Sequence, residues 1–571
     1  MRRQSAFIFI GIVAVIVTAG LTAPPQAHAI PAFARKYQTS CTTCHDSFPH
    51  LNDFGKAFKD AGFKFPSEDE TFIKIPPVLL GAPAQKELWP KTVWPGTIPG
   101  MPPIGLRMNN FFQVVGRNRG NFESVQPPPP GVAGPPFVPG FVPRSDFETG
   151  LFSIFTAGNF GSDIAFWVDD DLSVAGAGGA GGLGDGYLKF VNIGRFLHLP
   201  KDALHLRAGQ FELELPFSPA RSWNLSPWDI YDQAAIGSIN PNANVLQHNV
   251  NNGFALSNAA QGVELSGGHH YGGYYWALAI VNQTTGTQTI DTSGLVPSAT
   301  GANSGGLGFL SDANFKDIYG RLAYRFNLER DSASRRAIQA AGAMGPRTHT
   351  YLTVGTLYYY GRSVQRVVGA DSTGAPASLT AREPFYRVGG DFDFNYRNFN
   401  LFGQFVYGRD HNLLPVCNPT VDSLCTGTPL TAAGTTALIP LPVETGVSPI
   451  PVGFVHSIPA TFSGGFLQAD YMPLPWIMLI MRYDGVNTWA DFINGQESIT
   501  AGNFFGPVRH TRNRFTPGVQ FLIHANIKAS FEYQIRPQQQ VLNGINPITG
   551  ATVVTNPFRT NTVTAGLEFV Y

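Results

Sequence analysis

The sequence contains little cysteine and little charge. Only four of its 571 residues are cysteine, and 14% are charged, with 39 basic against 39 acidic residues. So few cysteines exclude a disulfide-rich scaffold, and the balanced charge gives no basic surface of the kind that binds nucleic acid. Blade-length repeats are also missing, which excludes a β-propeller. Glycine and aromatic residues are abundant instead, with 63 glycines and 12% aromatic residues.

The only long apolar run near the N-terminus is short for a membrane span. Basic residues at Arg2 and Arg3 precede an apolar stretch from Ala6 to Leu21, and Ala27-His28-Ala29 fits a small-residue cleavage site. This order of segments predicts a signal peptide over residues 1–29 and a mature chain that starts at Ile30. A retained membrane anchor is the alternative.

Two of the four cysteines lie in the stretch SCTTCHDSFPH, which begins at Ser40. In an exported protein, cysteines spaced like Cys41 and Cys44 occur in disulfides, metal sites and covalent haem sites. The adjacent His45 favours haem c, because both thiols can form thioethers with haem vinyl groups and the histidine can bind the iron. A thioredoxin-type dithiol needs a βαβ setting and a zinc site needs a second ligand pair, and neither follows in the sequence.

A short amphipathic helix is predicted directly after this motif. Apolar residues recur there at helical spacing, at Leu51, Phe54, Phe58 and Ala61. Charged residues lie between them, at Asp53, Lys56, Lys59 and Asp60, and Gly62 is placed to end the helix. Residues 30–66 hold too little apolar surface to fold without a cofactor or a partner surface. We therefore expect the apolar face to pack on the porphyrin.

The motif leaves the sixth ligand of the haem iron open. Met101, in the Pro-rich stretch IPGMPPIG, is a candidate whose thioether would raise the reduction potential. His50 follows His45 by only five residues, which is close for reaching the opposite face of the haem. The other candidates are Met108, His269, His270 and a water molecule.

Residues 67–103 read as a Pro-rich, extended linker, and beyond them the pattern changes to a period of two. In FYRVGGDFDFNYR, apolar residues such as Tyr386 and Val388 alternate with charged residues such as Arg387 and Asp391. The same alternation recurs in NIKASFEYQIR and in the last segment, which ends on Tyr571. Such strands have one apolar and one polar face, as in a membrane barrel or a soluble sandwich.

The lengths of the connections separate these two folds. We count about sixteen strands in residues 104–571, near Gly105, Phe147, Asp163, Asp185, Ala203, Gln261, Gly273, Lys316, Thr348, Phe385, Asn398, Phe462, Pro475, Thr511, Asn526 and Thr560. Short turns are expected at Gly161, His269, Met472 and His524, and they alternate with long loops such as 216–260 and 410–461. This asymmetry is typical of an antiparallel outer-membrane β-barrel with short periplasmic turns, so both termini are expected on the periplasmic side.

Several side chains of this barrel carry further expectations. Charges expected in the lumen are Arg321, Arg325, Asp391, Arg397 and Glu532. The run Asp169 to Asp171 is expected at the outer mouth, either as an attractor of hydrated cations or as a solvated strand end. Cys417 and Cys425 lie in one long loop and are predicted to form a local disulfide.

The segment FARKYQTSCTTCHDSFPHLNDFGKAFKDAGF, ahead of a sixteen-stranded barrel, resembles a family. It is similar to the outer-membrane monohaem cytochrome-porin fusions that include the iron oxidase of iron-oxidising bacteria. The resemblance is densest from Phe33 to Phe63. It implies that Cys41, Cys44 and His45 carry one covalent haem c in or under the lumen, and that electrons cross the outer membrane.

The sequence thus leads to two functional hypotheses. The first is an electron conduit, an Fe(II):cytochrome oxidoreductase in its enzymatic form, which takes electrons from extracellular Fe(II) and passes them to a periplasmic cytochrome or copper protein. The second is a solute-transport porin in which the haem segment has a structural or sensing role. A polar lumen suits both hypotheses, so the lumen charges do not separate them.

Overall fold

The computed structural model describes residues 32–66, 69–79, 87–91, 97–98, 104–115, 144–161, 163–172, 182–218, 221–232, 256, 259–282, 287–291, 316–328, 350–370, 376–411, 413–416, 429–432, 435–438, 453–456, 460–488, 506–507, 511–535, 542–545, 552–555 and 561–571. The signal peptide predicted over residues 1–29, Met101, and the pair Cys417 and Cys425 lie outside these residues.

Sixteen antiparallel strands close into one barrel, as the sequence predicts. In order around the barrel they are β5 (Ile104–Val115), β6 (Arg144–Phe160), β7 (Ile164–Asp171), β8 (Gly182–Phe190), β9 (His205–Phe211), β10 (Ala260–Gly268), β11 (Gly273–Val281), β13 (Asp317–Asn327), β14 (Tyr351–Ala370), β15 (Pro376–Tyr396), β16 (Phe399–Asp410), β21 (Ala460–Leu474), β22 (Ile477–Thr488), β24 (Thr511–His524), β25 (Ile527–Gln534) and β28 (Thr562–Val570). Strand β28 pairs with β5 and closes the ring. The short β12 (Thr287–Asp291) runs parallel to β14.

The two faces of the barrel wall differ as the alternation predicts. In β15 the side chains of Arg387 and Asp391 are buried inside, whereas Val388 between them is exposed on the outside. In β11 the small side chain of Ala279 is buried, whereas Leu278 and Ile280 are exposed. A closed barrel with an apolar outer face and a polar interior is the architecture of porin-like outer-membrane proteins.

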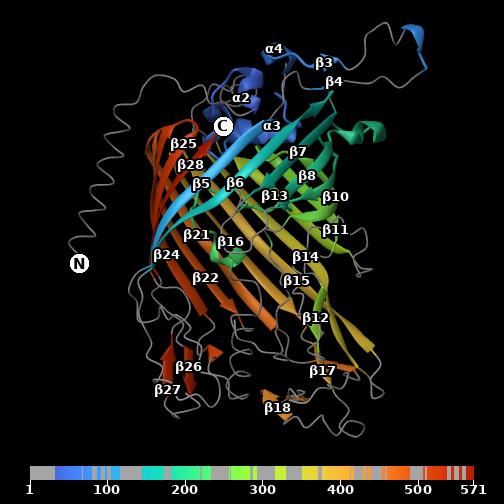
Figure 1. Ribbon diagram of the computed structural model, residues 1–571. Helices are drawn as coiled ribbons and strands as arrows, with labels where there is room; N and C mark the ends of the chain where they lie inside the picture. Colours follow the sequence, from blue (N-terminus) through green and yellow to red (C-terminus); the bar gives the residue numbers. More distant parts are fainter. Residues whose placement is uncertain are drawn as a thin grey trace, which may run out of the picture.

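The short turns lie at one end of the barrel, and small loop sheets lie at the other (Figure 1). Two-residue turns at 397–398, 475–476 and 525–526 join consecutive strands. The last two lie slightly beyond the positions predicted from Met472 and His524, because β21 and β24 continue past a β-bulge. The small sheets pair β17 (Leu413–Val416) with β20 (Gly453–His456), β18 (Pro429–Ala432) with β19 (Thr435–Leu438), and β26 (Leu542–Ile545) with both β23 (Gly506–Pro507) and β27 (Thr552–Thr555).

The N-terminal unit lies at the short-turn end (Figure 1). Its elements are α2 (Ala32–Tyr37), the 3-10 turn η1 (Cys41–Thr43), β1 (His45–Ser47), β2 (His50–Leu51), α3 (Asp53–Asp60) and α4 (Asp69–Phe72), and a β3 (Val78–Leu79) and β4 (Thr97–Ile98) pair follows. Another 3-10 turn, η2 (Ile193–Leu197), lies in the connection from β8 to β9. Among the described residues, no helix is long and apolar enough to cross a membrane.

Helix α3 is the helix predicted after the haem motif. Gly62, with φ +77°, follows its end as predicted. Its apolar residue Phe58 packs on Phe33 and Tyr37 of α2, with ring centroids 5.0 and 5.8 Å apart, and on Phe63. The apolar face of α3 therefore belongs to an aromatic core of the N-terminal unit itself, and this core continues onto Ala165 in the barrel wall.

One long connection was predicted to lie outside the barrel, but part of it runs through the interior. Residues 221–232, which include α6 (Asp229–Asp232), start near the end of β9 and bond to β22, β24 and β25. Strand β22 is the eighth strand from β9 in either direction around the sixteen-stranded ring, so it is diametrically opposite. This crossing segment, as we call residues 221–232, therefore spans the lumen.

One further expectation about charge is wrong. Arg397 lies in the turn between β15 and β16 and is exposed, so it does not line the lumen. The run from Asp169 to Asp171 ends β7, the third strand of the barrel, as expected. Successive residues of a strand point to opposite faces, so Asp169 and Asp170 do not share one face. Asp169 accepts hydrogen bonds from Trp167 Nε1 and the Asp185 backbone N–H, whereas Asp170 is exposed.

Candidate functional site

The two cysteines of the motif lie one turn apart. Ser40 caps η1 by accepting a hydrogen bond from the Thr42 N–H, and the Cys44 N–H donates to the Cys41 carbonyl at 3.1 Å. Side chains three apart eclipse one another in a 3-10 turn, so Cys41 and Cys44 share one side of it. Both thiols are free and partly buried. Burial raises the pKa of both, that of Cys44 to about 12.

The ring of His45 is oriented by two backbone carbonyls. Its Nδ1 lies 3.2 Å from the Pro49 oxygen and 3.3 Å from the His50 oxygen, so the Nδ1 proton is donated there. That tautomer leaves the lone pair of Nε2 available to a metal. Burial lowers the pKa of His45 to about 4, which keeps the imidazole neutral near pH 7. Two thiols on one side of a turn and a neutral, oriented imidazole meet the requirements of haem c attachment.

Asn52 and Gly55 hold this loop against α3. The Asn52 side chain accepts from the Gly55 N–H at 2.9 Å as N-cap of α3, and its amide donates to the Thr42 and Thr43 carbonyls. The Asn52 N–H donates to the Cys44 carbonyl at 3.0 Å. At Gly55 a Cβ would collide with that same carbonyl oxygen. The loop that carries Cys41, Cys44 and His45 is thus fixed to the first turn of the helix.

The loop that follows His45 is seated on the barrel wall. Lys528 of β25 donates to the Phe48 carbonyl at 2.8 Å, and the Arg107 guanidinium lies 5.4 Å from the centre of the Phe48 ring. Glu568 forms ion pairs with Lys528 at 2.7 Å and with Arg107 at 2.6 Å. On the other side, the His50 ring lies 4.2 Å from the ring of Trp223 in the crossing segment.

The charged face of α3 also contacts the barrel. Asp53 forms a bidentate ion pair with Arg325 of β13, with distances of 2.8 and 2.6 Å. The Lys56 ammonium lies 5.6 Å from the ring of Tyr351 in β14. The charged residues expected between the apolar positions of the helix therefore contact side chains of the barrel wall.

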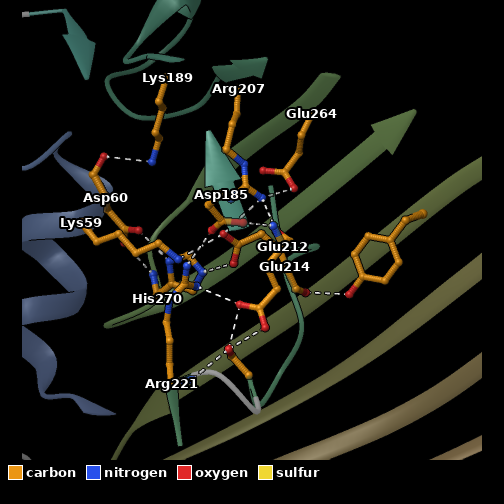
Figure 2. Close-up of polar contacts among 12 residues, drawn as sticks. Lys59, Asp60, Asp185, Lys189, Arg207, Glu212, Glu214, Arg221, Glu264 and His270 are labelled. Atoms are coloured by element: carbon orange, nitrogen blue, oxygen red, sulfur yellow. Dashed lines mark hydrogen bonds and ion pairs between the residues drawn. The ribbon is translucent and has the colours of Figure 1, made fainter. Parts of the chain in front are cut away.

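The C-terminal end of α3 enters a larger ion network (Figure 2). His270, in the turn between β10 and β11, lies 2.6 Å from Asp60 and 3.5 Å from Glu214, and Lys59 lies 3.3 Å from the same Glu214. Figure 2 shows how Asp60 and Lys59 point from the helix toward these partners. The network continues through Arg207 to Glu264, and through Arg221 to Glu212 and Asp185.

The protonation states of His270 and Asp60 follow from the groups around them. Burial alone would lower the pKa of His270, but the charge of Asp60 and hydrogen bonds to Asp60 and Glu214 outweigh it and raise that pKa. Burial alone would raise the pKa of Asp60, but His270 outweighs it and lowers that pKa. The ion pair between α3 and the barrel is therefore charged over a wide range of pH.

The crossing segment is anchored to the far wall by its backbone. The N–H groups of Leu225 and Ser226 donate to Glu532 at 2.6 and 3.1 Å, and the Asp229 N–H donates to Asp484 at 3.0 Å. Its Trp228 stacks on Phe466 of β21, with ring centroids 4.6 Å apart. A polar and aromatic segment thus lies across the lumen beyond the loop of Cys41, Cys44 and His45.

Cys41, Cys44 and His45 lie together at η1 and the start of β1. The structure also places two of the side chains that were candidates for the sixth iron ligand. Met108 faces outward, because its neighbour Arg107 points inward to Glu568. His270 is bound to Asp60. Met101 is outside the described residues.

Among the residues of the site that sequence reasoning missed are Asn52, Lys528 and Trp223. Asn52 stands directly before the helix and is an N-cap by residue type, so its place was predictable. Lys528 and Trp223 gave no such signal. Lys528 is 480 residues from its partner Phe48, and Trp223 is more than 170 residues from its partner His50.

No protein-family model matches the chain, and no curated protein matches it. Solved porin structures do match. OprB of Pseudomonas putida is 10% identical, with 82% of this chain and 94% of that chain covered and a TM-score of 0.43. OmpF of Salmonella typhi, in complex with daunomycin, is 9% identical, with 82% and 97% covered and a TM-score of 0.39. OmpT of Vibrio cholerae is 8% identical, with 82% and 98% covered and a TM-score of 0.35. At these values no residue role is transferred to this chain.

Proposed function

We propose that this protein is an electron conduit of the outer membrane. It holds one covalent haem c at the short-turn end of its barrel and oxidises an extracellular donor, with Fe(II) as the favoured donor. Each Fe(II) becomes Fe(III) and gives up one electron, which reduces a periplasmic cytochrome or copper protein. The oxidoreductase activity lies in this one-electron exchange.

The observation that carries this proposal is the arrangement of the side chains of Cys41, Cys44 and His45. Cys41 and Cys44 have free thiols on one side of η1, and Nδ1 of His45 is held by two carbonyls. We assign the two thioethers to the cysteines and the proximal iron ligand to Nε2 of His45. A bound haem c supplies reversible one-electron chemistry at its iron.

The protein residues around the motif have separate tasks in this proposal. Asn52 and Gly55 fix the attachment loop to α3, and Lys528 fixes its far side to β25. The ion pairs of Asp53 and Asp60 hold the helix at the barrel end. Because the crossing segment spans the lumen, a dissolved donor on the loop side is kept from free passage to the opposite end.

The second candidate is a solute-transport porin, and the polar, closed, sixteen-stranded barrel favours it. Against it stands the crossing segment, whose Trp228 and Ile230 are buried in a core of aromatic and aliphatic side chains inside the barrel. A wide aqueous channel has no need of such a core. Permeation and electron transfer can be measured separately.

The test is anaerobic mixing of purified, oxidised protein in detergent with Fe(II). We expect the haem absorption bands to change to those of the reduced form, and we expect His45→Ala to lose the reaction, because the proximal ligand is removed. Covalent haem in the wild type that no Fe(II) reduces contradicts the choice of donor. A wild type with no covalent haem contradicts the conduit and leaves the porin.

A further inference from the structure

The connection from β8 to β9 is longer than the two-residue turns at the same end of the barrel, and it carries η2. Phe196 and Leu197 of η2 are among the most exposed apolar side chains of the described residues, at 72% and 65%, and Leu199 directly after η2 is also exposed. Figure 1 shows η2 as a coil that projects sideways from the short-turn end, beside β8. Three large apolar side chains thus lie within four residues on a part of the chain that stands outside the barrel wall.

Hydrogen bonds fix the backbone of this connection. Asn192, which enters η2 with a φ of +57°, donates its N–H to Nδ1 of the buried His205 at 2.9 Å. The Asn192 side chain accepts from the Asp202 N–H at 3.1 Å, and the Leu199 N–H donates to the Gly194 carbonyl at 2.9 Å. The exposed apolar side chains are therefore presented on a backbone that is tied to the first residue of β9.

Exposed aromatic side chains gather at the short-turn end of several other strands. Tyr274 of β11 pairs directly with Tyr324 of β13, and both are exposed. The further exposed aromatic residues at this end include Tyr396, Tyr471, Trp476, Phe569 and Tyr571. Such a belt marks the level of the lipid headgroups around a transmembrane barrel. Among the described residues of β8, β9 and β10, none is an exposed aromatic, so the belt has a gap at the strands next to η2.

We propose that η2 is a lipid-contact turn, and that Phe196, Leu197 and Leu199 insert between the headgroups and acyl chains of the phospholipid leaflet at the short-turn end. Phe196 then supplies the aromatic side chain that β8, β9 and β10 lack. The Arg195 guanidinium lies 4.8 Å from the centre of the Phe196 ring and forms an ion pair of 2.8 Å with Asp163. A charged group held over an inserted ring suits the headgroup level. This inference goes beyond the proposed function and does not require the haem.

Phospholipid fits this surface better than a second copy of the chain. The outer face of the wall beside η2 is apolar, with Leu188 of β8 and Leu265 of β10 exposed. Strands β8, β9 and β10 are consecutive in the ring, and lipid covers the outer face of such a barrel. Because η2 projects sideways from the end of this wall, its apolar side chains continue the surface that lipid already covers.

The experiment places a trifluoromethyl-phenylalanine at position 196 of the full-length protein. The protein is reconstituted at one copy per phospholipid nanodisc, so that no second copy can cover η2. Two control proteins carry the same probe in place of Tyr274, which lies in the aromatic belt, or of Phe72 in α4, which belongs to the N-terminal unit. The measurement is fluorine relaxation with a nitroxide on the lipid headgroups and, separately, with a water-soluble gadolinium chelate. Heat-dependent electrophoretic mobility reports that each barrel has formed.

We expect the headgroup nitroxide to increase relaxation at position 196 as much as at position 274, and several-fold more than at position 72. The gadolinium chelate should act chiefly at position 72. Relaxation at position 196 by the chelate alone would place the side chain in water and overturn the proposal. Relaxation by neither reagent would show that another part of the chain covers η2, which also overturns it. A headgroup effect that disappears when each disc holds several copies would assign the surface to a second copy instead of lipid.

Discussion

His45 illustrates how much of the site is decided by single atoms. Its Nδ1 proton is committed to the Pro49 and His50 carbonyls, so one nitrogen is left for coordination. Metal-bound histidines ordinarily make such a bond to a carbonyl or carboxylate, because it fixes the tautomer and the ring orientation. The neutral form is held by burial, which lowers the His45 pKa to about 4.

The first prediction concerns the two thiols. Replacing Cys41 and Cys44 together by alanine should abolish covalent haem, because no thioether can form. The measurement is haem staining of the denatured protein after electrophoresis. The barrel itself should still form, which its heat-dependent mobility reports. Covalent haem in the double variant would show that the site is wrongly assigned.

The second prediction concerns Gly55. A Cβ there collides with the Cys44 carbonyl, a backbone atom that cannot rotate away, so Gly55→Ala should displace the attachment loop from α3. We expect the covalent haem content of the purified protein to drop several-fold. Gly320→Ala is the matched control, because a Cβ at Gly320 meets open space. Equal haem content in both variants would contradict the role given to this contact.

At the scale of elements, the contact of α3 with the barrel should depend on pH. The pKa of His270 is raised above 6.5 in the folded protein, so its contribution is complete below pH 6.5 and is lost as the pH rises through the raised value. The pKa of Asp60 is lowered below 3.8, so its contribution is lost only as the pH falls through that lower value. The contact is therefore strongest between these two limits.

The third prediction follows for hydrogen exchange in residues 53–60. Protection, corrected for intrinsic rates, should fall at alkaline pH in the wild type. In His270→Ala it should be lower from the start and lack this dependence, because a charge-assisted bond worth about 1.5–3 kcal/mol is missing. His269→Ala, on the same turn, should behave as the wild type. Equal protection of the wild type at neutral and alkaline pH would show that the ion pair of His270 with Asp60 does not hold α3 to the barrel.

The fourth prediction concerns the crossing segment. Glu532→Ala combined with Asp484→Ala removes the acceptors of three backbone N–H groups, and each one left unpaired costs about 1–3 kcal/mol. The segment should detach, and liposomes with this variant should swell faster in small sugars than wild-type liposomes. Asp170→Asn, at an exposed position, should change nothing. Rapid swelling with the wild type would contradict a barrier across the lumen.

At the scale of the whole molecule, the barrel was predictable because its signal is local. Each strand alternates apolar and polar residues, and a pattern such as that around Arg387 places one face outward wherever the strand lies. The motif of Cys41, Cys44 and His45 is a local signal of the same kind, since its three residues are contiguous or nearly so, and the haem that it indicates stays a prediction.

The contacts between these parts were not predictable. Residues 221–232 contain one proline, two tryptophans and several polar residues, a composition that also suits an outer loop. Only their non-local partners, such as Glu532 and Asp484, place them inside. The charged residues of α3 suggest a face in water by their type alone. Their partners Arg325 and His270 lie more than 200 residues away, so only the closed barrel brings them together.

The most direct test of the account uses sealed liposomes that carry the protein in their membrane. A cytochrome too large for any pore is enclosed together with a chromogenic Fe(II) chelator, and Fe(II) is added outside. We expect the enclosed cytochrome to be reduced while the chelator stays colourless, and we expect His45→Ala to abolish the reduction without changing the permeability. Coloured chelator with no haem-dependent reduction of the cytochrome would contradict an electron conduit and indicate a pore.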